Sequence, residues 1–98
     1  MAKGYWITLY RSVSNAAALQ EYARLAGPVI EAAGGRFVVR GVPTKIFEDG
    51  VNDRTVIIEF DSVQKAIATY ESPGYAVALK ALGNAAVRDM RFVEGFTG

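Results

Sequence analysis

The seven residues GYWITLY (residues 4–10) contain the features that decide the fold. Tyrosine, tryptophan, isoleucine and threonine fit the pleated backbone, so the segment predicts a first β-strand. Side chains alternate between the two faces of a strand, and here both alternate rows are largely apolar. The segment therefore predicts a sheet that has a cover on each face.

The next segment has the periodicity of an amphipathic helix. Ser14 or Asn15 can cap it, apolar residues recur at steps of three and four up to Ala33, and Gly34 with Gly35 ends it. Residues 36–40 predict a second strand, with residues 45–48 as an alternative continuation, and residues 54–60 predict a third.

The second half of the chain repeats this alternation. Asp61 or Ser62 can cap a helix that runs to about residue 71, and Ser72 followed by Pro73 predicts a further helix to about residue 82. Residues 88–94 predict the last strand. The order indicates an α+β, ferredoxin-like βαββαβ sandwich, with a four-strand antiparallel sheet and helices on one face. We expect one domain over residues 1–98, with its core at about residues 4–95.

The strand rows predict which side chains face the helices. The row assigned to the core is Tyr5, Ile7, Leu9, Phe37, Val39, Val56, Ile58, Phe60, Met90 and Phe92. The row assigned to the open face is Trp6, Thr8, Tyr10, Arg36, Val38, Arg40, Thr55, Ile57, Glu59, Arg91 and Val93. An antiparallel sheet that faces water normally shows a polar row, so this mixed row predicts a homodimer formed through the open sheet face.

Composition excludes several classes of function. Lys and Arg number 11 against 10 Asp and Glu, so the net charge of +1 argues against nucleic acid as a partner. The sequence has no cysteine and no histidine, which removes thiolate chemistry, most metal sites and the usual proton carrier near neutral pH. No segment resembles a signal peptide or a membrane span. We therefore predict a cytoplasmic protein with no metal, no cofactor and no membrane partner.

Several short motifs, in order along the chain, resemble the domain-of-unknown-function family 1330, which is part of the dimeric α/β-barrel superfamily. They are Gly34-Gly35-Arg36-Phe37, Arg40-Gly41, Arg54, Ile58-Glu59-Phe60, Tyr70-Glu71-Ser72-Pro73-Gly74-Tyr75 and Val93-Glu94-Gly95. The resemblance implies a homodimer whose two sheets form a barrel. The superfamily includes cofactor-independent oxygenases, isomerases and ligand-sensing domains, so it implies no single activity.

Two groups of residues are candidates for a binding site. Arg36 and Arg40 share the predicted open face with Glu59, beside Trp6, and could clamp an acid or simply form an ion pair. The second group, Tyr70, Ser72 and Tyr75, surrounds the break between the last two helices, and Tyr22 on the first helix could line the same space. These residues could bind a carboxylate, or they could be a helix cap with core aromatics.

The leading hypothesis is a homodimeric protein that binds a small apolar or aromatic acid. One alternative is a cofactor-independent enzyme of the oxygenase or isomerase type, in which Tyr, Arg and Glu side chains stabilise an enolate. Another alternative is a purely structural or interaction dimer. No catalytic residue is assigned, and whether the protein is an enzyme is left open by the sequence.

Overall fold

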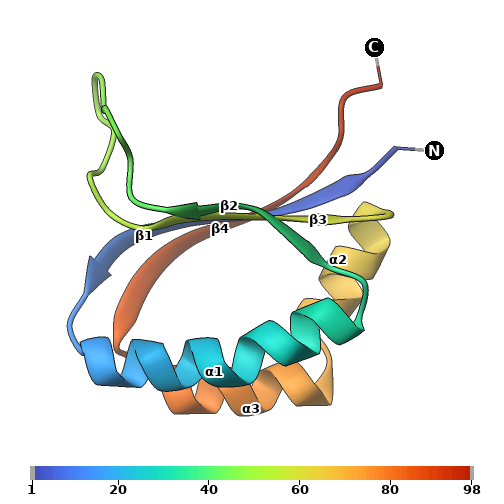
Figure 1. Ribbon diagram of the computed structural model, residues 1–98, viewed down its shortest axis with the longest axis horizontal. Helices are drawn as coiled ribbons and strands as arrows, with labels where there is room; N and C mark the ends of the chain where they lie inside the picture. Colours follow the sequence, from blue (N-terminus) through green and yellow to red (C-terminus); the bar gives the residue numbers. More distant parts are fainter. Residues whose placement is uncertain (1, 98) are drawn as a thin grey trace.

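The computed structural model describes residues 2–97 and has the predicted ferredoxin-like architecture (Figure 1). The elements in chain order are β1 (Gly4–Val13), α1 (Ala16–Ala32), β2 (Arg36–Gly41), β3 (Thr55–Phe60), α2 (Val63–Tyr70), α3 (Pro73–Leu82) and β4 (Ala86–Glu94). Residues 45–48 form no strand and belong to the loop that joins β2 to β3. β1 and β4 are each longer than predicted, because they pair with one another beyond residue 10.

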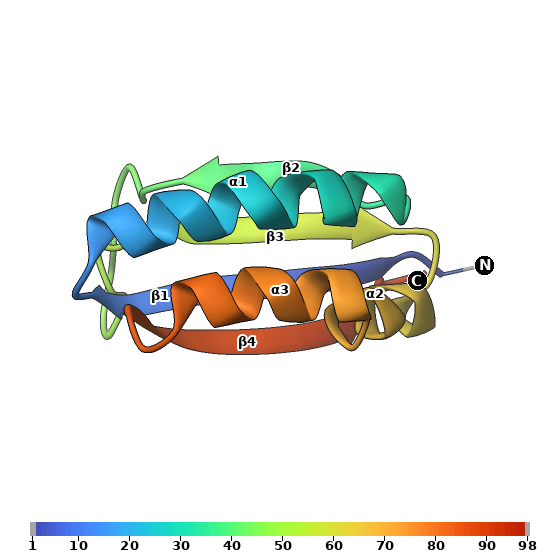
Figure 2. The ribbon, with the colours of Figure 1, turned by 90° about the horizontal axis from the view of Figure 1, so that it is seen from below.

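The sheet is antiparallel and has the order β2-β3-β1-β4. β1 lies in the middle, with Trp6 opposite Ile58 of β3 on one side and opposite Phe92 of β4 on the other. Figure 2 shows the helical layer on one face, with α1 running over β2 and β3 and α3 running over β1 and β4. α1 packs chiefly against α3 and less closely against the strands.

Each helix begins at a residue that the sequence predicts as a cap. Asn15 accepts a hydrogen bond from the backbone N–H of Ala18, and Ser62 accepts one from Lys65. Ser72 accepts one from Tyr75 and stands directly before Pro73 at the first turn of α3. These side chains satisfy backbone donors that have no partner inside the helix, which explains why the helices start where they do.

The prediction of which β1 residues face the helices is wrong. Trp6 and Tyr10 are 1% and 4% exposed and lie in the core, together with Thr8. Tyr5, Ile7 and Leu9 lie on the open face instead. Because both rows of β1 are apolar, alternation alone could not decide between them, and the aromatic row is the one that fills the space under the helices.

The prediction for Arg40 is also wrong, and the cause is a β-bulge in β2. The register between β2 and β3 shifts between Phe37 and Val39, so one extra residue stands on the β2 side. A bulge reverses the alternation beyond it. Arg36 therefore stays on the open face opposite Glu59, while Arg40 pairs with Val56 and turns to the helical side.

The first strand passes very close to α2 at Gly4. A Cβ atom added at Gly4 would lie 2.2 Å from the backbone nitrogen of Val63, so no larger residue fits there without a shift of the backbone. This contact holds the start of α2 against the start of β1, and the ring of Trp6 lies 6.4 Å from that of Phe60 in the same part of the core.

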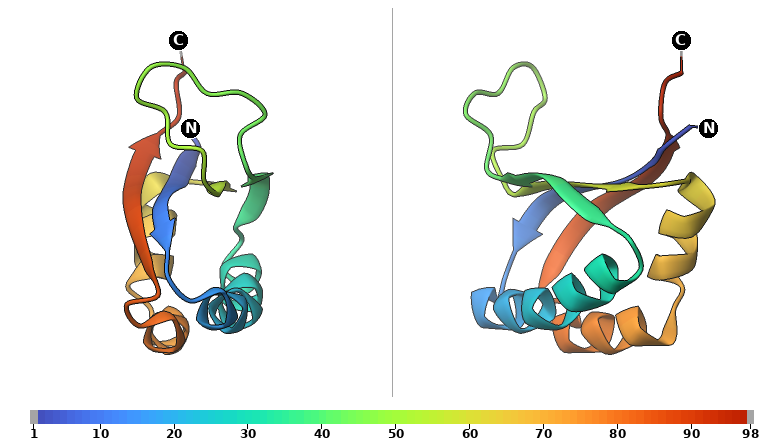
Figure 3. Two further views of the ribbon diagram at one scale, coloured as in Figure 1. Left: turned by 90° about the vertical axis from the view of Figure 1, so that its left-hand side faces the viewer. Right: turned by 45° about the vertical axis from the view of Figure 1, so that its right-hand side comes forward.

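Within residues 2–97 the face of the sheet opposite the helices is covered at one end alone, where the loop between β2 and β3 forms a pocket with Leu9, Asp89 and Arg91. Figure 3 shows the loop between β2 and β3 rising from this side at one end of the sheet, with the chain termini rising at the other end. Ile7, Leu9 and Ile57 are half-buried on this face, whereas Val39 and Val93 are exposed. None of the helices in residues 2–97 combines the length and apolar character that crossing a membrane requires.

Candidate functional site: an arginine-lined cleft under α1

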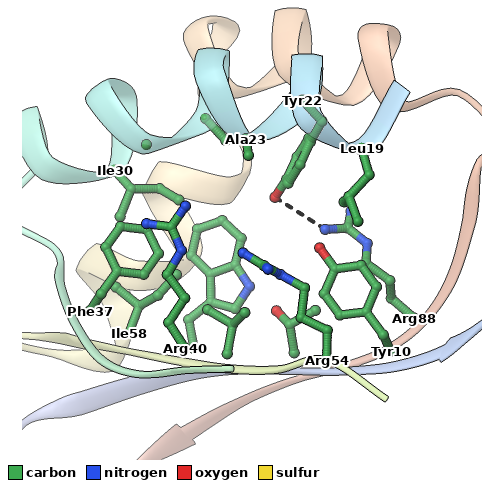
Figure 4. Close-up of a pocket in the computed structure, with 15 residues that line it drawn as sticks. Tyr10, Leu19, Tyr22, Ala23, Ile30, Phe37, Arg40, Arg54, Ile58 and Arg88 are labelled. Atoms are coloured by element: carbon green, nitrogen blue, oxygen red, sulfur yellow. Dashed lines mark hydrogen bonds between the residues drawn. The ribbon is translucent and has the colours of Figure 1, made fainter. Parts of the chain in front are cut away.

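A narrow cleft lies between α1 and the helical face of the sheet (Figure 4). Its walls are mostly aromatic and aliphatic. The side chains that line it come from α1 (Leu19, Tyr22, Ala23, Ala26, Gly27, Ile30), from β1 (Trp6, Thr8, Tyr10) and from the remaining strands and the loop before β3 (Phe37, Arg40, Arg54, Val56, Ile58, Arg88). An apolar space with a few polar groups that converge on it is the usual form of a small-molecule site.

Three arginines enter this cleft from three different segments. The bulge turns Arg40 of β2 inward, Arg54 directly precedes β3, and Arg88 of β4 stands opposite Tyr10 of β1. The guanidinium carbon of Arg40 lies 4.9 Å from the centre of the Phe37 ring. That of Arg88 lies 4.9 Å from the Tyr22 ring and 5.7 Å from the Tyr10 ring, so two aromatic faces hold it in place.

No acidic side chain neutralises these arginines within residues 2–97. The five ion pairs found there join Lys3 to Asp61, Arg11 and Arg91 to Asp89, Arg24 to Glu21 and Arg36 to Glu59. Arg40, Arg54 and Arg88 take part in none of them, and no Asp or Glu lines the cleft. The protein carries a net charge of only +1, so this is a local concentration of positive charge.

A chain of hydrogen bonds closes the inner end of the cleft. The hydroxyl oxygens of Tyr22 and Tyr75 are 2.6 Å apart, and Arg88 donates to the Tyr22 hydroxyl over 3.1 Å. Tyr75 is fully buried, and its ring meets those of Trp6 and Tyr22 edge to face. α1, α3 and β4 each contribute one member of this chain, so it joins the two main helices to the edge of the sheet.

Burial governs the ionisation of these groups. Removal from water raises the pKa of Tyr75 far above its usual value, and the neighbouring Tyr22 adds to the effect. The pKa of Tyr10 is raised for the same two reasons. Burial opposes the charge of Arg88, but its contacts with Tyr22, Tyr75 and Tyr10 outweigh this and raise its pKa. Near neutral pH Arg88 is therefore charged, whereas Tyr75 and Tyr10 are neutral.

Arg40 and Arg54 stand at the mouth of the cleft. Both also line a shallow depression on the outside, together with Leu19 and Ala23 of α1. The free space in the cleft totals about 440 Å³ with its mouth included, but only about 30 Å³ of it can take the centre of a water molecule. That space suits a few ordered waters and is too small for an aromatic ring. A larger guest has to displace the two arginine side chains.

The residues predicted as site candidates are divided between three places. Trp6, Tyr22 and Arg40 line the cleft. Arg36 and Glu59 form an ion pair on the open face, where Glu59 also accepts a 2.8 Å hydrogen bond from Tyr5. The third place is the junction of α2 and α3 next to the cleft, which contains the half-buried Tyr70 and Ser72 and the buried Tyr75.

Within that third group the roles differ. The Tyr70 ring packs against Trp6 and Phe92 and does not line the cleft. Ser72 caps α3 and donates a 2.7 Å hydrogen bond to the carbonyl of Thr69. Only Tyr75 touches the site, through its hydrogen bond with Tyr22.

Sequence reasoning missed Arg54 and Arg88, although a signal for them exists. The predicted core rows run Val56, Ile58, Phe60 on β3 and Met90, Phe92 on β4. One step of two residues backwards along each row reaches Arg54 and Arg88. Because side chains two apart share a face, a charge at the end of a core row is a candidate for a buried site. No such signal showed that the Arg40 side chain faces the helices, because its orientation depends on the bulge.

The comparisons with known proteins agree with this fold. The chain is similar to the RPA0582 protein of unknown function from Rhodopseudomonas palustris, with 28% identity, a TM-score of 0.69, and coverage of 95% of this chain and 80% of that one. A methylated form of RPA0582 gives 25% identity, a TM-score of 0.74, and coverage of 98% and 82%. SnoaB, a cofactor-independent oxygenase from Streptomyces nogalater, shares 11% identity, a TM-score of 0.67, and coverage of 100% and 97%, which is a likeness of fold alone.

The search of functionally curated proteins gives no match. The sequence pattern of one family matches residues 3–96, which is nearly the whole chain, and the ferredoxin-like fold agrees with it. The chain therefore belongs to the family described as Domain of unknown function (DUF1330).

Proposed function

We propose that this protein binds a small apolar or aromatic carboxylic acid in the cleft under α1. The observation that carries the proposal is the set of three arginines, Arg40, Arg54 and Arg88, which face an aromatic space without an acidic partner within residues 2–97. A guanidinium binds a carboxylate through two parallel N–H groups, and the aromatic walls suit the apolar part of the ligand. The cleft offers no carboxylate to a basic ligand.

The position of the arginines suggests how a ligand enters. Arg40 and Arg54 lie between the cleft and the outer depression, and Arg40 is exposed to solvent. Arg88 is half-buried at the inner end and is held by Tyr10 and Tyr22. An acid would first pair with Arg40 and Arg54 and move their side chains away from the mouth. Its carboxylate would then pass to Arg88, so that an arginine balances its charge at each step.

Thermal unfolding in the presence of small acids tests this proposal. Benzoate and cyclohexanecarboxylate should raise the unfolding midpoint in proportion to the logarithm of their concentration, since a ligand at about 100 times its Kd stabilises the fold by roughly 2.7 kcal/mol. Benzyl alcohol, which has a similar size and no charge, should not. Arg88→Gln should abolish the shift with both acids, because Arg88 is the charge that the bound acid pairs with.

The control is Arg24→Gln, on the exposed side of α1, where the arginine pairs with Glu21 and does not line the cleft. This variant should respond to acids as the wild type does. If millimolar acids leave the midpoint unchanged, or if Arg24→Gln removes the shift as fully as Arg88→Gln, the cleft is not an acid-binding site.

The proposal includes self-association through the open face of the sheet. Tyr5, Ile7, Leu9 and Ile57 form an apolar band there, and the Arg36–Glu59 pair stands at its side. Burial of each large side chain contributes roughly 1.5–3 kcal/mol before the costs of association. A second copy placed face to face covers this band on both molecules with one contact.

A cofactor-independent enzyme is the second candidate, and the Tyr75–Tyr22–Arg88 hydrogen bonds favour it. Such a chain of donors could stabilise an enolate oxygen. Enolate formation also needs a base, however, and the cleft has no carboxylate and the chain no histidine. Binding therefore ranks first. Exchange of the α-hydrogens of phenylpyruvate in D₂O, followed by NMR with and without protein, would favour the enzyme if the protein accelerates it and Tyr22→Phe does not.

A further inference from the structure

The direction of the hydrogen bond between Tyr22 and Tyr75 follows from burial. Tyr75 is 0% exposed, and the Tyr22 oxygen is the one acceptor that its hydroxyl meets among residues 2–97. A buried hydroxyl without an acceptor is costly, so Tyr75 donates its proton to Tyr22. Arg88 has no acceptor atom and must also donate to Tyr22. Both lone pairs of the Tyr22 oxygen are then in use.

The hydroxyl proton of Tyr22 is therefore left over. It meets no acceptor among the described residues, and Tyr22 lines the cleft. An O–H group whose oxygen accepts two hydrogen bonds, one of them from a cation, is itself a stronger donor. An acceptor for the Tyr22 hydroxyl proton would therefore have to lie in the cleft.

The indole nitrogen of Trp6 is a second donor in the same situation. Trp6 is 1% exposed, and its Nε1–H is buried without a hydrogen-bond partner among residues 2–97. The ring is surrounded by Phe60, Tyr70, Tyr75 and Phe92. None of these rings offers an acceptor to the indole in this structure, whereas Trp6 also lines the cleft. Buried donors without a partner are rare in folded proteins, so a partner that binds in the cleft is a reasonable explanation for this one.

We propose that the Tyr22 hydroxyl and the Trp6 indole N–H bind the carboxylate oxygens of the ligand, beside Arg88. The inference rests on the proposed acid-binding function and adds an orientation to it. The carboxylate lies at the inner end of the cleft against three donors, and the apolar part of the ligand points toward Leu19, Ala23 and Phe37 nearer the mouth. The site then selects ligands whose head group only accepts hydrogen bonds, and it rejects amides and alcohols of the same shape, whose head groups also carry a donor.

The single tryptophan of the chain makes this testable by NMR. Its indole N–H gives one ¹H–¹⁵N resonance, which moves downfield when the group donates to an anion. Cyclohexanecarboxylate is the probe, because it has no aromatic ring current that could move the resonance without a hydrogen bond. On saturation we expect a downfield shift of the indole proton and slower exchange with water. Cyclohexylmethanol at the same concentration should produce neither.

Removal of the hydroxyls tests Tyr22. Tyr22→Phe alone leaves the buried Tyr75 hydroxyl without an acceptor, so the double variant Tyr22→Phe/Tyr75→Phe, which removes both hydroxyls, accompanies it. Arg88 loses the same acceptor in both variants. Both variants should bind cyclohexanecarboxylate about tenfold to a hundredfold more weakly, the usual range for a hydrogen bond to a charged group. Tyr70→Phe removes a hydroxyl outside the cleft and should bind like the wild type.

Two other results separate the orientation from the function. If the acid binds and Arg88→Gln abolishes binding, but the indole resonance does not move or the double variant keeps wild-type affinity, the orientation is wrong and the acid-binding function stands. If no acid binds to the wild type, both are overturned. The ¹H–¹⁵N spectrum of the double variant without ligand should overlay that of the wild type away from residues 22 and 75, which confirms the fold.

Discussion

At the scale of single residues, the polar groups of the cleft differ in how firmly they are held. Arg88 is half-buried, lies between the rings of Tyr10 and Tyr22 and donates to the Tyr22 hydroxyl. Arg40 is exposed and is held by the face of one ring, Phe37. A fixed inner charge and a movable outer charge suit a site that must open for its ligand and then orient it.

The buried phenols predict instability in alkali. The pKa of Tyr75 and that of Tyr10 are raised above 10.0, mainly because burial disfavours the phenolate. Below about pH 10 both phenols are protonated in the folded and the unfolded chain, so their contribution to stability is fully present. As pH rises further, the unfolded chain releases these protons and the folded chain retains them, so the free energy of unfolding falls.

Absorbance at 295 nm, which reports phenolate, measures this directly. The chain has five tyrosines, and those at positions 10 and 75 should titrate only in the transition in which the fold is lost. Tyr75→Phe should make unfolding in alkali less steep with pH, because one fewer proton is released. Smooth titration of all five tyrosines in a chain that stays folded would contradict this.

At the scale of secondary structure, the short break between α2 and α3 is stabilised by one side chain. Ser72 accepts a hydrogen bond from the N–H of Tyr75 and donates to the carbonyl of Thr69, so it ends one helix and starts the next. It does not line the cleft. Its part in the molecule is therefore to position α3, and through α3 the buried Tyr75.

Ser72→Ala should cost about 1 kcal/mol, within the range of about 0.5–2 kcal/mol for loss of a helix cap. In a domain of this size each kcal/mol lowers the unfolding midpoint by roughly 4–8 °C. Calorimetry measures the loss, and Ser12→Ala, at an exposed position of β1, is the control. Acid binding should keep its affinity below the midpoint. A variant that is as stable as the wild type but has lost binding would instead make Ser72 a ligand contact.

The helices and the element order could be predicted from the sequence, because local signals decide them. Asn15, Ser62 and Ser72 are strong caps, and Pro73 fits the first turn of a helix. The facing of β1 could not be predicted, because both of its rows are apolar and the choice depends on which row fills the space under α1 and α3. The orientation of Arg40 could not be predicted either, because nothing in the sequence of residues 36–41 marks the bulge.

At the scale of the whole molecule, the two faces of the sheet differ in what covers them. One face holds the cleft and the helices, and the other has an apolar band that residues 2–97 leave largely uncovered. Arg36, Glu59 and Tyr5 form a hydrogen-bonded group on that second face. A charge pair with its own partners can be covered by another protein surface at lower cost than an isolated charge.

Ile57→Lys should therefore convert a wild-type dimer into a monomer. Ile57 stands between Ile7 and Val39 at the centre of the apolar band, and a lysine there would bring two unpaired charges together across a twofold contact. Sedimentation velocity at micromolar concentration measures the mass. Val77→Lys, at a 58% exposed position of α3, is the matched control and should leave the mass unchanged. A monomeric wild type, or a dimer that survives Ile57→Lys, would contradict association through this face.

The bulge in β2 has a further consequence, because β2 is an outer strand of the sheet. An outer strand presents a row of free backbone N–H and C=O groups, and a regular row is a template onto which another chain can add a strand and begin to aggregate. The extra residue between Phe37 and Val39 interrupts that row after only a few residues. The bulge that turns Arg40 into the cleft thus also makes this edge strand a poor template for the addition of strands from other chains.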